Sequence, residues 1–184
     1  MNIFIKSAAT IIALIIVALI LPTCGARMET VRQLMSFENS RVVLPEIMMV
    51  LEDGNVYYKK LPSECNRFIA YFGSEDCSNC VINRIEETIN PLIRVSDSLK
   101  LFEVITIMTP PMEERDGVIE AIKRKRYMFP IYIDDLNTSN LSETIPEDSR
   151  FHFFLLGKSG RVKYVGYPIN NEGISLNFIK TISY

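Results

Sequence analysis

The stretch Arg67-Phe68-Ile69-Ala70-Tyr71-Phe72-Gly73-Ser74-Glu75-Asp76-Cys77-Ser78-Asn79-Cys80-Val81-Ile82 decides the fold of this chain. Its first six residues form a continuous apolar run, which is typical of a strand buried on both faces. Its last part opens a pattern with helical spacing, made up of Val81, Ile82, Ile85, Ile89, Leu92 and Ile93. The sequence therefore places the pair Cys77 and Cys80 where a strand gives way to a helix.

This position favours a reactive dithiol. Residues three apart lie on one face of a helix. A cysteine at the helix start meets unpaired backbone N–H groups and the positive end of the helix dipole. Because the thiolate is the nucleophilic form of cysteine, Cys77 is the expected nucleophile. A C-x-x-C spacing alone is shared with zinc half-sites, but the preceding strand and the following helix favour a redox pair.

Outward from this stretch, the pattern predicts further strands and helices on both sides. On the N-terminal side, 46–51 and 56–61 are predicted strands joined by a tight turn at Asp53-Gly54. Pro91 is expected to kink or end the first helix. The later elements are a strand at 101–108, a helix at 112–127, a strand at 130–133, a polar loop at 137–150, strands at 151–156 and 161–167 around a turn at 157–160, and a helix at 173–182. The inward side of the last helix is predicted to carry Ile174, Phe178, Ile179 and Ile182. This order specifies an α/β sandwich with helices over a mixed central sheet.

The N-terminus carries an export signal. Lys6 precedes an uncharged, mostly apolar stretch from Ser7 to Leu21, which is followed by Pro22-Thr23-Cys24-Gly25-Ala26. Cys24 resembles the lipidated cysteine of a bacterial lipoprotein. The alternatives are a retained signal anchor, although the stretch is shorter than the ~20 residues of a membrane span, and cleavage after Ala26. All three place the body of the protein outside the cytoplasm, where disulfides persist.

The predicted organisation is a signal peptide at 1–23, a membrane-proximal spacer at 24–41 and one domain at 42–184. Removing residues 1–23 leaves 161 residues with 19 basic and 22 acidic side chains. A chain of this length fits one domain with a sizeable core, and its nearly neutral balance argues against a nucleic-acid partner. The basic run 123–126 ends a helical stretch with an acidic start, as the helix dipole prefers.

From about Val42 to Ile182 the chain resembles the thioredoxin superfamily. The resemblance rests on the order of elements, the dithiol between strand and helix, the segment Phe129-Pro130-Ile131-Tyr132-Ile133-Asp134-Asp135 and the hairpin at 153–162. The membrane-tethered, extracytoplasmic TlpA-like and ResA-like thiol-disulfide proteins are the branch that it resembles. This implies a thioredoxin-like sandwich in which Cys77 attacks the disulfide of a partner protein and Cys80 resolves the mixed disulfide. We expect protein thiols and disulfides as partners, and no cofactor.

The chain departs from the pattern of that superfamily at three places. It has no Trp, and Gly73 and Asp76 occupy the places of the aromatic residues before the dithiol. Tyr71 stands where thioredoxins carry a buried carboxylate. Phe151 stands near the place of the cis-proline that faces the dithiol, and a cis bond at a non-proline residue costs about 3 kcal/mol. We therefore expect the loop before the last hairpin to be trans or rearranged.

Local charge predicts the direction of electron flow. Glu75 and Asp76 directly precede Cys77, and negative charge nearby opposes a thiolate. A destabilised thiolate favours a reductant or isomerase over a strong oxidant. The alternative is that Glu75 and Asp76 only cap the helix.

Further residues could act with the dithiol. Arg150, Phe151 and His152 precede the last hairpin and are candidate modulators, and His152 is the only histidine. A histidine satisfied by its neighbours is one interpretation, and a site for a soft ion such as Cu(I) on Cys77, Cys80 and His152 is another. Cys65 is a semi-buried cysteine or a third redox centre, and adding it would complete a Cys₃His zinc set. A non-catalytic interaction domain is the remaining alternative.

Overall fold

A computed structural model describes residues 28–134, 141–169 and 172–183. Two compact units divide the chain, Met1–Phe37 and Glu38–Tyr184. In the first unit, residues 28–37 form a helix with an ion pair between Arg32 and Glu29. Among the described residues, no helix combines the length and the apolar character needed to cross a membrane. The predicted signal peptide and Cys24 lie outside the described residues.

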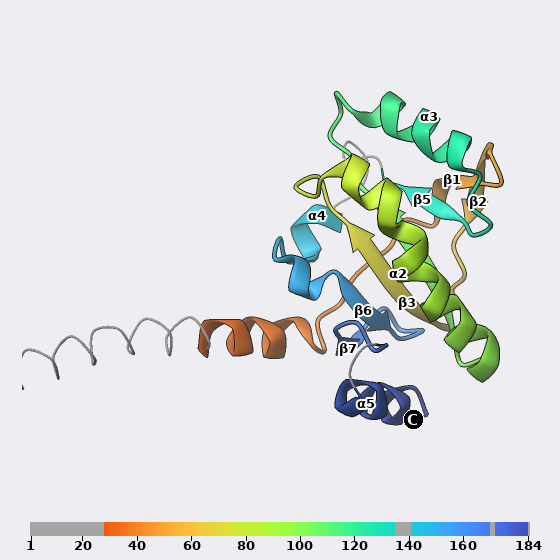
Figure 1. Cartoon of the computed structure of the whole chain (residues 1–184). Coiled ribbons are helices and arrows are strands. Elements are labelled where there is room, and N and C mark those ends of the chain that lie inside the picture. Colours follow the sequence, from red (N-terminus) through yellow and green to blue (C-terminus); the bar gives the residue numbers. More distant parts are fainter. Residues whose placement is uncertain (1–27, 135–140, 170–171, 184) are drawn as a thin grey trace, which may run out of the picture. The chain divides into compact units, whose positions relative to one another are not determined.

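The second unit is built on a seven-stranded mixed sheet with the order β2-β1-β5-β4-β3-β6-β7 (Figure 1). Its strands are β1 (Ile47–Glu52), β2 (Asn55–Lys60), β3 (Asn66–Phe72), β4 (Phe102–Met108), β5 (Ile131–Ile133), β6 (Phe153–Leu156) and β7 (Val162–Val165). The pairs β3–β4 and β4–β5 are parallel, and the other neighbouring strands are antiparallel. The predicted mixed sheet is confirmed.

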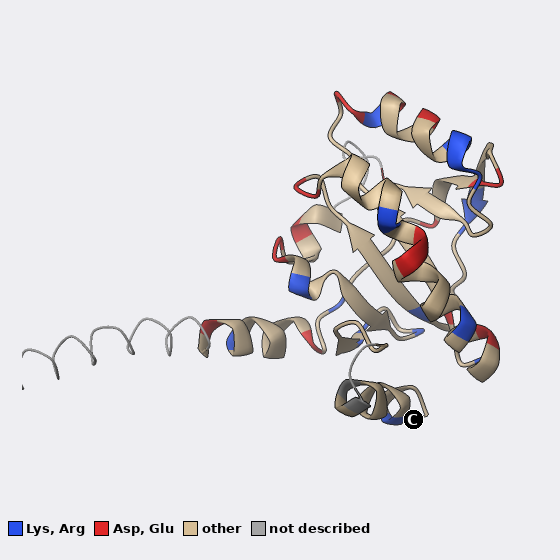
Figure 2. Ribbon diagram, viewed as in Figure 1, with Lys and Arg blue, Asp and Glu red and all other residues tan. Residues whose placement is uncertain are grey.

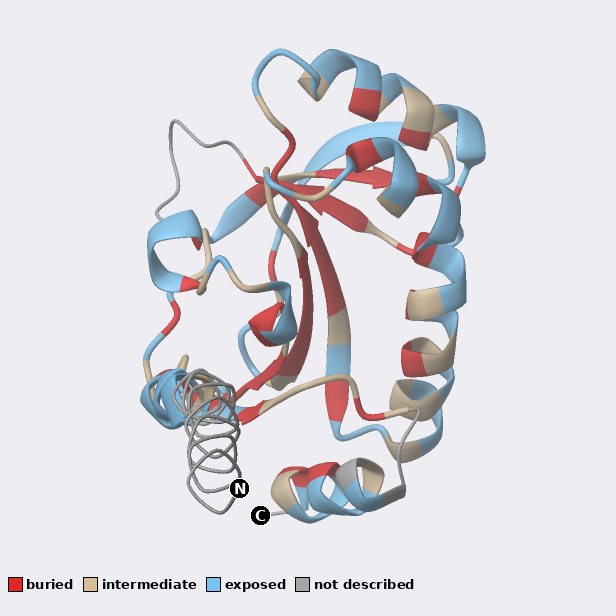
Figure 3. Ribbon diagram, turned by 60° about the vertical axis from the view of Figure 1, so that its left-hand side comes forward, coloured by how far each residue is buried: buried red, intermediate tan, exposed pale blue. Residues whose placement is uncertain are grey.

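The helices are α2 (Ser78–Leu99), α3 (Arg115–Lys125), α4 (Leu141–Thr144) and α5 (Glu172–Ile182), with a 3₁₀ turn η1 (Ser149–Phe151). One core cluster joins α2, α3 and α5 to one face of the sheet through Ile85, Ile89, Val118, Ile122 and Phe178. In Figure 3 the buried strands run beside the long helix α2, whose buried residues face the sheet. The strand β3 is buried over its central five residues, as its apolar run predicts.

The helices differ from the sequence-based expectations at two places. The helix α2 does not end at Pro91 but continues to Leu99, because Ile89 and Leu92 on either side are fully buried and their packing offsets the lost hydrogen bond of the proline. In α5, Ile179 is exposed, while Phe178 and Ile182 are buried as predicted. The side chain of Ile174 is outside the described part of the chain.

The predicted polar loop at 137–150 contains ordered elements. It includes α4 and begins η1, and both Leu141 and Ile145 are buried. Residues 135–140 are outside the described part. The two buried residues are only one helical turn apart, which is too short a stretch for a helical pattern to be recognised from the sequence.

Candidate active site

The site begins in the connection between β3 and α2. Asp76 closes this connection on itself, because its backbone N–H donates to the Gly73 carbonyl at 3.1 Å and its Oδ2 accepts the Gly73 N–H at 2.8 Å. A Cβ atom at Gly73 would lie 3.3 Å from the ring of Tyr71. The small residue at 73 therefore lets the chain turn closely over Tyr71.

Cys77 is the N-cap residue of α2. Its backbone is extended (φ −64°, ψ 101°), and its Sγ accepts the backbone N–H of Cys80 at 3.3 Å. The two cysteines are joined by a disulfide across Cα atoms 5.2 Å apart, and both residues are exposed. The dithiol therefore sits at the helix start, as the sequence predicts, with sulfur taking the role that Ser or Asp usually has at this position.

The alternative interpretation of Glu75 and Asp76 as helix caps is wrong. Cys77 occupies the cap position, and the first turn of α2 contains no acidic residue. Glu75 is exposed, and the carboxylate of Asp76 accepts the Gly73 N–H. Asp76 still lies directly next to Cys77 in the chain, so its charge acts on the sulfur without satisfying the helix terminus.

Ser78 is a site residue that the sequence reasoning missed. Its side chain is buried, and its hydroxyl donates to Glu114 Oε2 at 2.9 Å. This contact ties the first residue of α2 to the connection before α3. No local signal could have revealed it, because the two residues are 36 positions apart.

His152 is buried at 5% exposure, with defined neighbours on both ring nitrogens. Its Nε2 lies 3.1 Å from the Pro146 carbonyl, and its Nδ1 lies 3.6 Å from Asp76 Oδ2. The imidazole also stands edge-to-face against Tyr71, with ring centroids 5.1 Å apart. Among the described residues, no three His, Cys, Asp or Glu side chains form a group that could hold a metal ion. The imidazole thus has a polar neighbour at each ring nitrogen, and one of these neighbours, Asp76, directly precedes Cys77 in the chain.

Arg150 and Phe151 lie in η1 and have different roles. The exposed guanidinium of Arg150 pairs with Asp148, and this contact lowers the pKa of the Asp148 carboxyl. Phe151 is 2% exposed and belongs to the core. The described residues contain no cis peptide bond, so the prediction that this loop is trans or rearranged is confirmed.

A buried carboxylate lies near Tyr71, but it belongs to the residue that follows β5 and not to β3. Burial raises the pKa of Tyr71, and its hydroxyl contacts Thr109. Thr109 Oγ1 donates in turn to Asp134 Oδ2 at 3.3 Å, and Asp134 is only 2% exposed. Asp134 follows β5, so tertiary structure brings its carboxylate to the hydroxyl groups beneath the β3–α2 connection.

Cys65 is half-buried and precedes β3, whereas the dithiol follows the other end of that strand. The seven residues of β3 separate the two ends by about 20 Å at the usual rise of a strand. Burial, and then the charge of Glu103, raise the pKa of the Cys65 thiol. Cys65 therefore lies too far from the dithiol to complete a Cys₃His zinc set with it, and its role as a separate redox centre stays an untested alternative.

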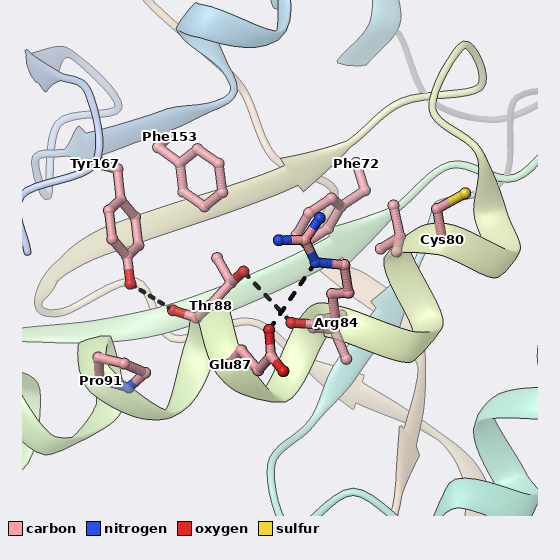
Figure 4. Close-up of a pocket in the computed structure, with 10 residues that line it drawn as sticks. Phe72, Cys80, Arg84, Glu87, Thr88, Pro91, Phe153 and Tyr167 are labelled. Atoms are coloured by element: carbon pink, nitrogen blue, oxygen red, sulfur yellow. Dashed lines mark hydrogen bonds and ion pairs between the residues drawn. The ribbon is translucent and has the colours of Figure 1, made fainter. Parts of the chain in front are cut away.

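A groove of about 550 Å³ begins at Cys80 and runs along α2. Helix α2 supplies one wall, and aromatic side chains of β3, β6 and the segment after β7 supply the other (Figure 4). Phe153 stands edge-to-face to both Phe72 and Tyr167, and the Tyr167 hydroxyl donates to the Thr88 carbonyl at 2.9 Å. The groove is lined by Phe72, Cys80, Val81, Arg84, Ile85, Glu87, Thr88, Pro91, Phe153 and Tyr167.

Comparisons with known proteins are informative only at the level of structure. No family model matches the chain, and no curated protein sequence matches it. A solved structure of a candidate thiol:disulfide interchange protein DsbE from Chlorobium tepidum is similar with a TM-score of 0.51 at 9% identity, over 79% of this chain and 97% of the other.

Two more solved structures are similar, with lower TM-scores. One is a candidate electron transfer protein from Aquifex aeolicus VF5 (TM-score 0.49, 14% identity, 79% of this chain and 96% of the other). The other is the thioredoxin domain of a thiol-disulfide oxidoreductase from Bacteroides vulgatus (TM-score 0.42, 13% identity, 78% and 98%). The likeness to the Chlorobium protein and the seven-stranded mixed sheet with flanking helices show a thioredoxin-like fold.

Proposed function

With a thioredoxin-like fold and a CxxC pair as the premise, we propose that this chain is an extracytoplasmic thiol-disulfide oxidoreductase of the reductase or isomerase type. The main support for the proposal is the position of Cys77 at the N-cap of α2. Its Sγ accepts a hydrogen bond from the Cys80 N–H and forms a disulfide with Cys80. A thiolate at this position is stabilised by the helix dipole and by a backbone donor.

In the proposed cycle, the Cys77 thiolate attacks a disulfide of the substrate protein. The substrate's leaving sulfur departs as a thiolate, and a mixed disulfide forms on Cys77. Cys80 is deprotonated and attacks Cys77 Sγ, which releases the second substrate sulfur. The substrate has gained two electrons and two protons, and the Cys77–Cys80 disulfide is restored.

The charges around Cys77 support the reducing direction. Asp76 and the exposed Glu75 add negative charge beside the sulfur, which disfavours its thiolate and hence lessens the driving force for acting as an oxidant. Lys and Arg are interspersed with Asp and Glu over the helices of the second unit in Figure 2, so the described surface offers a protein substrate charges of both signs.

Metal delivery is not proposed, because Nε2 of His152 contacts a carbonyl and its Nδ1 faces Asp76. A cuprous ion would need one of these nitrogens together with both thiolates. The alternative of a non-catalytic interaction domain predicts that the Cys77–Cys80 pair reduces no disulfide, and the assay below measures this activity.

The test is reduction of disulfide-bonded insulin by the full chain with dithiothreitol as the electron source. We expect catalysed reduction that falls to the dithiothreitol background in Cys77→Ser, because the thiolate is the attacking group. Cys80→Ser should accumulate a mixed disulfide on Cys77, and Cys65→Ser, the matched control, should keep full activity. A wild-type chain with no activity above background would rule out the enzymatic function.

The proposed location rests on the N-terminal sequence. We propose that residues 1–23 are a signal peptide and that Cys24 is lipidated, with 24–41 as a spacer and 42–184 as the redox domain. Cys24→Ala should then release the protein from membranes or block its processing in a bacterial host. A wild-type chain with an unblocked N-terminus at Arg27 would instead support cleavage after Ala26.

A further inference from the structure

The two sulfurs of the disulfide differ in their surroundings, although both cysteines are exposed. The groove along α2 has Cys80 at one end, and Cys77 is not part of its lining. Figure 4 shows Cys80 beside the row of groove residues on α2, with its sulfur projecting toward the loop that precedes the helix. An attacking thiolate approaches a disulfide in line with the S–S bond, from the side away from the leaving sulfur. Of the two cysteines, Cys80 is the one that a molecule bound in the groove contacts.

We propose that a reductant recharges the oxidised protein by attacking Cys80 from this groove, whereas the substrate reacts at Cys77. The inference rests on the proposed function and adds to it that opposite halves of the cycle use different sulfurs. Exposure of Cys80 is the condition for this division, because a buried second cysteine leaves only the first open to attack.

The leaving group favours attack at Cys80. Breaking the disulfide at Cys80 expels Cys77 as a thiolate at the N-cap, where the Cys80 N–H already donates to its sulfur at 3.3 Å. Attack at Cys77 would expel Cys80, which lies within the first turn of the helix and is not its cap. The negative charges of Glu75 and Asp76 offset part of this stabilisation, but the hydrogen bond of the N-cap is made to Cys77 and not to Cys80. Since thiol-disulfide exchange is faster when the leaving thiolate is more stable, we expect the first route to be preferred.

The reaction balances with a dithiol reductant. One thiolate of the reductant attacks Cys80 Sγ, a new S–S bond forms, and the electron pair of the Cys77–Cys80 bond goes to Cys77. The second thiol of the reductant loses its proton to water and attacks the reductant sulfur of the mixed disulfide. Cys80 leaves as a thiolate and takes up a proton, and the reductant has lost two electrons in forming its own disulfide.

The lining of the groove indicates which kind of side chain lies next to the attacking thiol of the reductant. Its walls are mostly carbon, from Phe72, Phe153 and Tyr167 opposite the helix. Its facing charges, Arg84 and Glu87, lie 3.9 Å apart as an ion pair on the rim. A groove whose charges already balance matches a neutral group, so the occupant is a thiol-bearing segment with an aromatic or aliphatic side chain next to its cysteine.

The first experiment maps the attacked sulfur in the unmodified full chain. Oxidised protein is mixed with 2-phenylethanethiol and trapped at several short times with a large excess of iodoacetamide at mildly alkaline pH, which alkylates free thiolates, and each adduct is assigned by fragmentation of the peptide. At the shortest times we expect the thiol on Cys80 and the acetamide on Cys77, by about tenfold over the reverse. Predominant addition of the thiol to Cys77 would overturn the proposal.

The second experiment tests the groove. We expect 2-phenylethanethiol to reduce the disulfide about tenfold faster than 2-mercaptoethanol, because partial burial of a phenyl ring in the groove stabilises the encounter by roughly 1.4 kcal/mol. Val81→Gln places an amide in the groove and should remove most of this preference. Asn83→Gln, on the same helix and outside the groove lining, should keep it. An equal preference in all three proteins, or none in wild type, would count against the groove.

These results are separable from the proposed function. A chain that reduces insulin but takes the thiol on Cys77 retains the function and loses the inference. Thiol addition to Cys80 in a chain without insulin reduction supports the sulfur assignment and removes the enzymatic function. The mapping uses wild-type protein, so it decides the assignment even if Val81→Gln does not fold.

Discussion

At the scale of single residues, the helix cap and the expected nucleophile are the same side chain. Cys77 has the extended backbone of an N-cap and accepts the Cys80 N–H with its sulfur. A hydrogen bond to a charged acceptor is about twice as strong as one between neutral groups. A thiolate at Cys77 would therefore make a stronger cap for α2 than a thiol.

Asp76 connects this cap to the buried part of the site. Its Oδ2 accepts the Gly73 N–H and lies 3.6 Å from His152 Nδ1. A carbonyl oxygen can only accept a hydrogen bond, so Nε2 of His152 carries a proton toward Pro146, while Nδ1 lies toward the carboxylate of Asp76. We propose that His152 is a positioning residue behind Asp76 and takes no part in the chemistry.

His152→Ala tests this role. We expect the free energy of unfolding to fall by about 1–3 kcal/mol, because the half-buried Pro146 carbonyl loses its donor and the buried imidazole ring is removed. Insulin reduction should stay within about threefold of wild type, since the reactivity of the thiolate comes from the helix start. Urea unfolding and the insulin assay measure the two quantities.

The matched control for His152→Ala is Arg150→Ala, two residues away on the surface, which should change neither quantity measurably. Loss of reductase activity in a stable His152→Ala protein would mean that the imidazole takes part in the chemistry. Tight Cu(I) binding by wild type that collapses in this variant would favour the metal alternative.

At the scale of elements, the β1–β2 hairpin depends on its two-residue turn. Asp53 (φ 46°) and Gly54 (φ 77°) both have positive φ, as a type I′ turn requires. A Cβ at Gly54 would lie 3.2–3.3 Å from the side chain of Arg126 and the Lys123 carbonyl. Gly117, by contrast, is exposed inside α3 with no atom within 4 Å of its would-be Cβ.

These two glycines give opposite predictions. Gly54→Ala should destabilise the protein by about 1 kcal/mol or more, because it combines an unfavourable φ with close contacts. Gly117→Ala should stabilise it by roughly 0.5–1 kcal/mol, because alanine is the better helix former and has open space. Urea unfolding of both variants beside wild type measures the two shifts, and a stabilised Gly54→Ala would show that the turn can relax.

At the scale of the whole molecule, three tyrosines from different parts of the fold are buried in the core. Tyr127, Tyr132 and Tyr164 are each 4% exposed or less. Burial raises the pKa of each to about 12. Tyr127 donates its hydroxyl to the Ile82 carbonyl, whereas the Tyr164 hydroxyl has no hydrogen-bond partner within the described part of the chain.

These tyrosines predict a loss of stability in alkali. The folded pKa of each is raised above the unfolded value near 10, so their contribution is fully present below pH 10. It declines as the pH rises through 10 toward 12, by up to about 1.4 kcal/mol per pH unit for each tyrosine. Urea unfolding at pH 8, 9, 10 and 10.5 should show a free energy that is level and then falls.

Tyr164→Phe isolates one of these groups, because it removes a titrating hydroxyl without breaking a hydrogen bond found in the structure. It should lessen the alkaline slope and leave stability at pH 8 equal or higher. Tyr127→Phe should also lessen the slope, but at a cost at pH 8. An unchanged slope in both variants would show that other groups control the alkaline transition.

The sequence alone determined the features that depend on neighbouring residues. The apolar run at 67–72, the Asp-Gly turn and the apolar spacing at 81–93 predicted β3, the first hairpin and the inner face of α2, because strand, turn and helix signals repeat within a few residues. The same local signals placed Cys77 and Cys80 at a helix start. The missing proline at Phe151 also predicted correctly that the loop has no cis bond.

Only the tertiary structure decided which residues far apart in the chain come into contact. It buried Ser78 against Glu114, set His152 beside Asp76 and connected Tyr71 to Asp134 through Thr109. It also exposed Ile179, carried α2 through Pro91 and opened a groove at Cys80. The physical reason is that periodicity fixes which residues share a face, whereas the partner of that face depends on how separate elements pack.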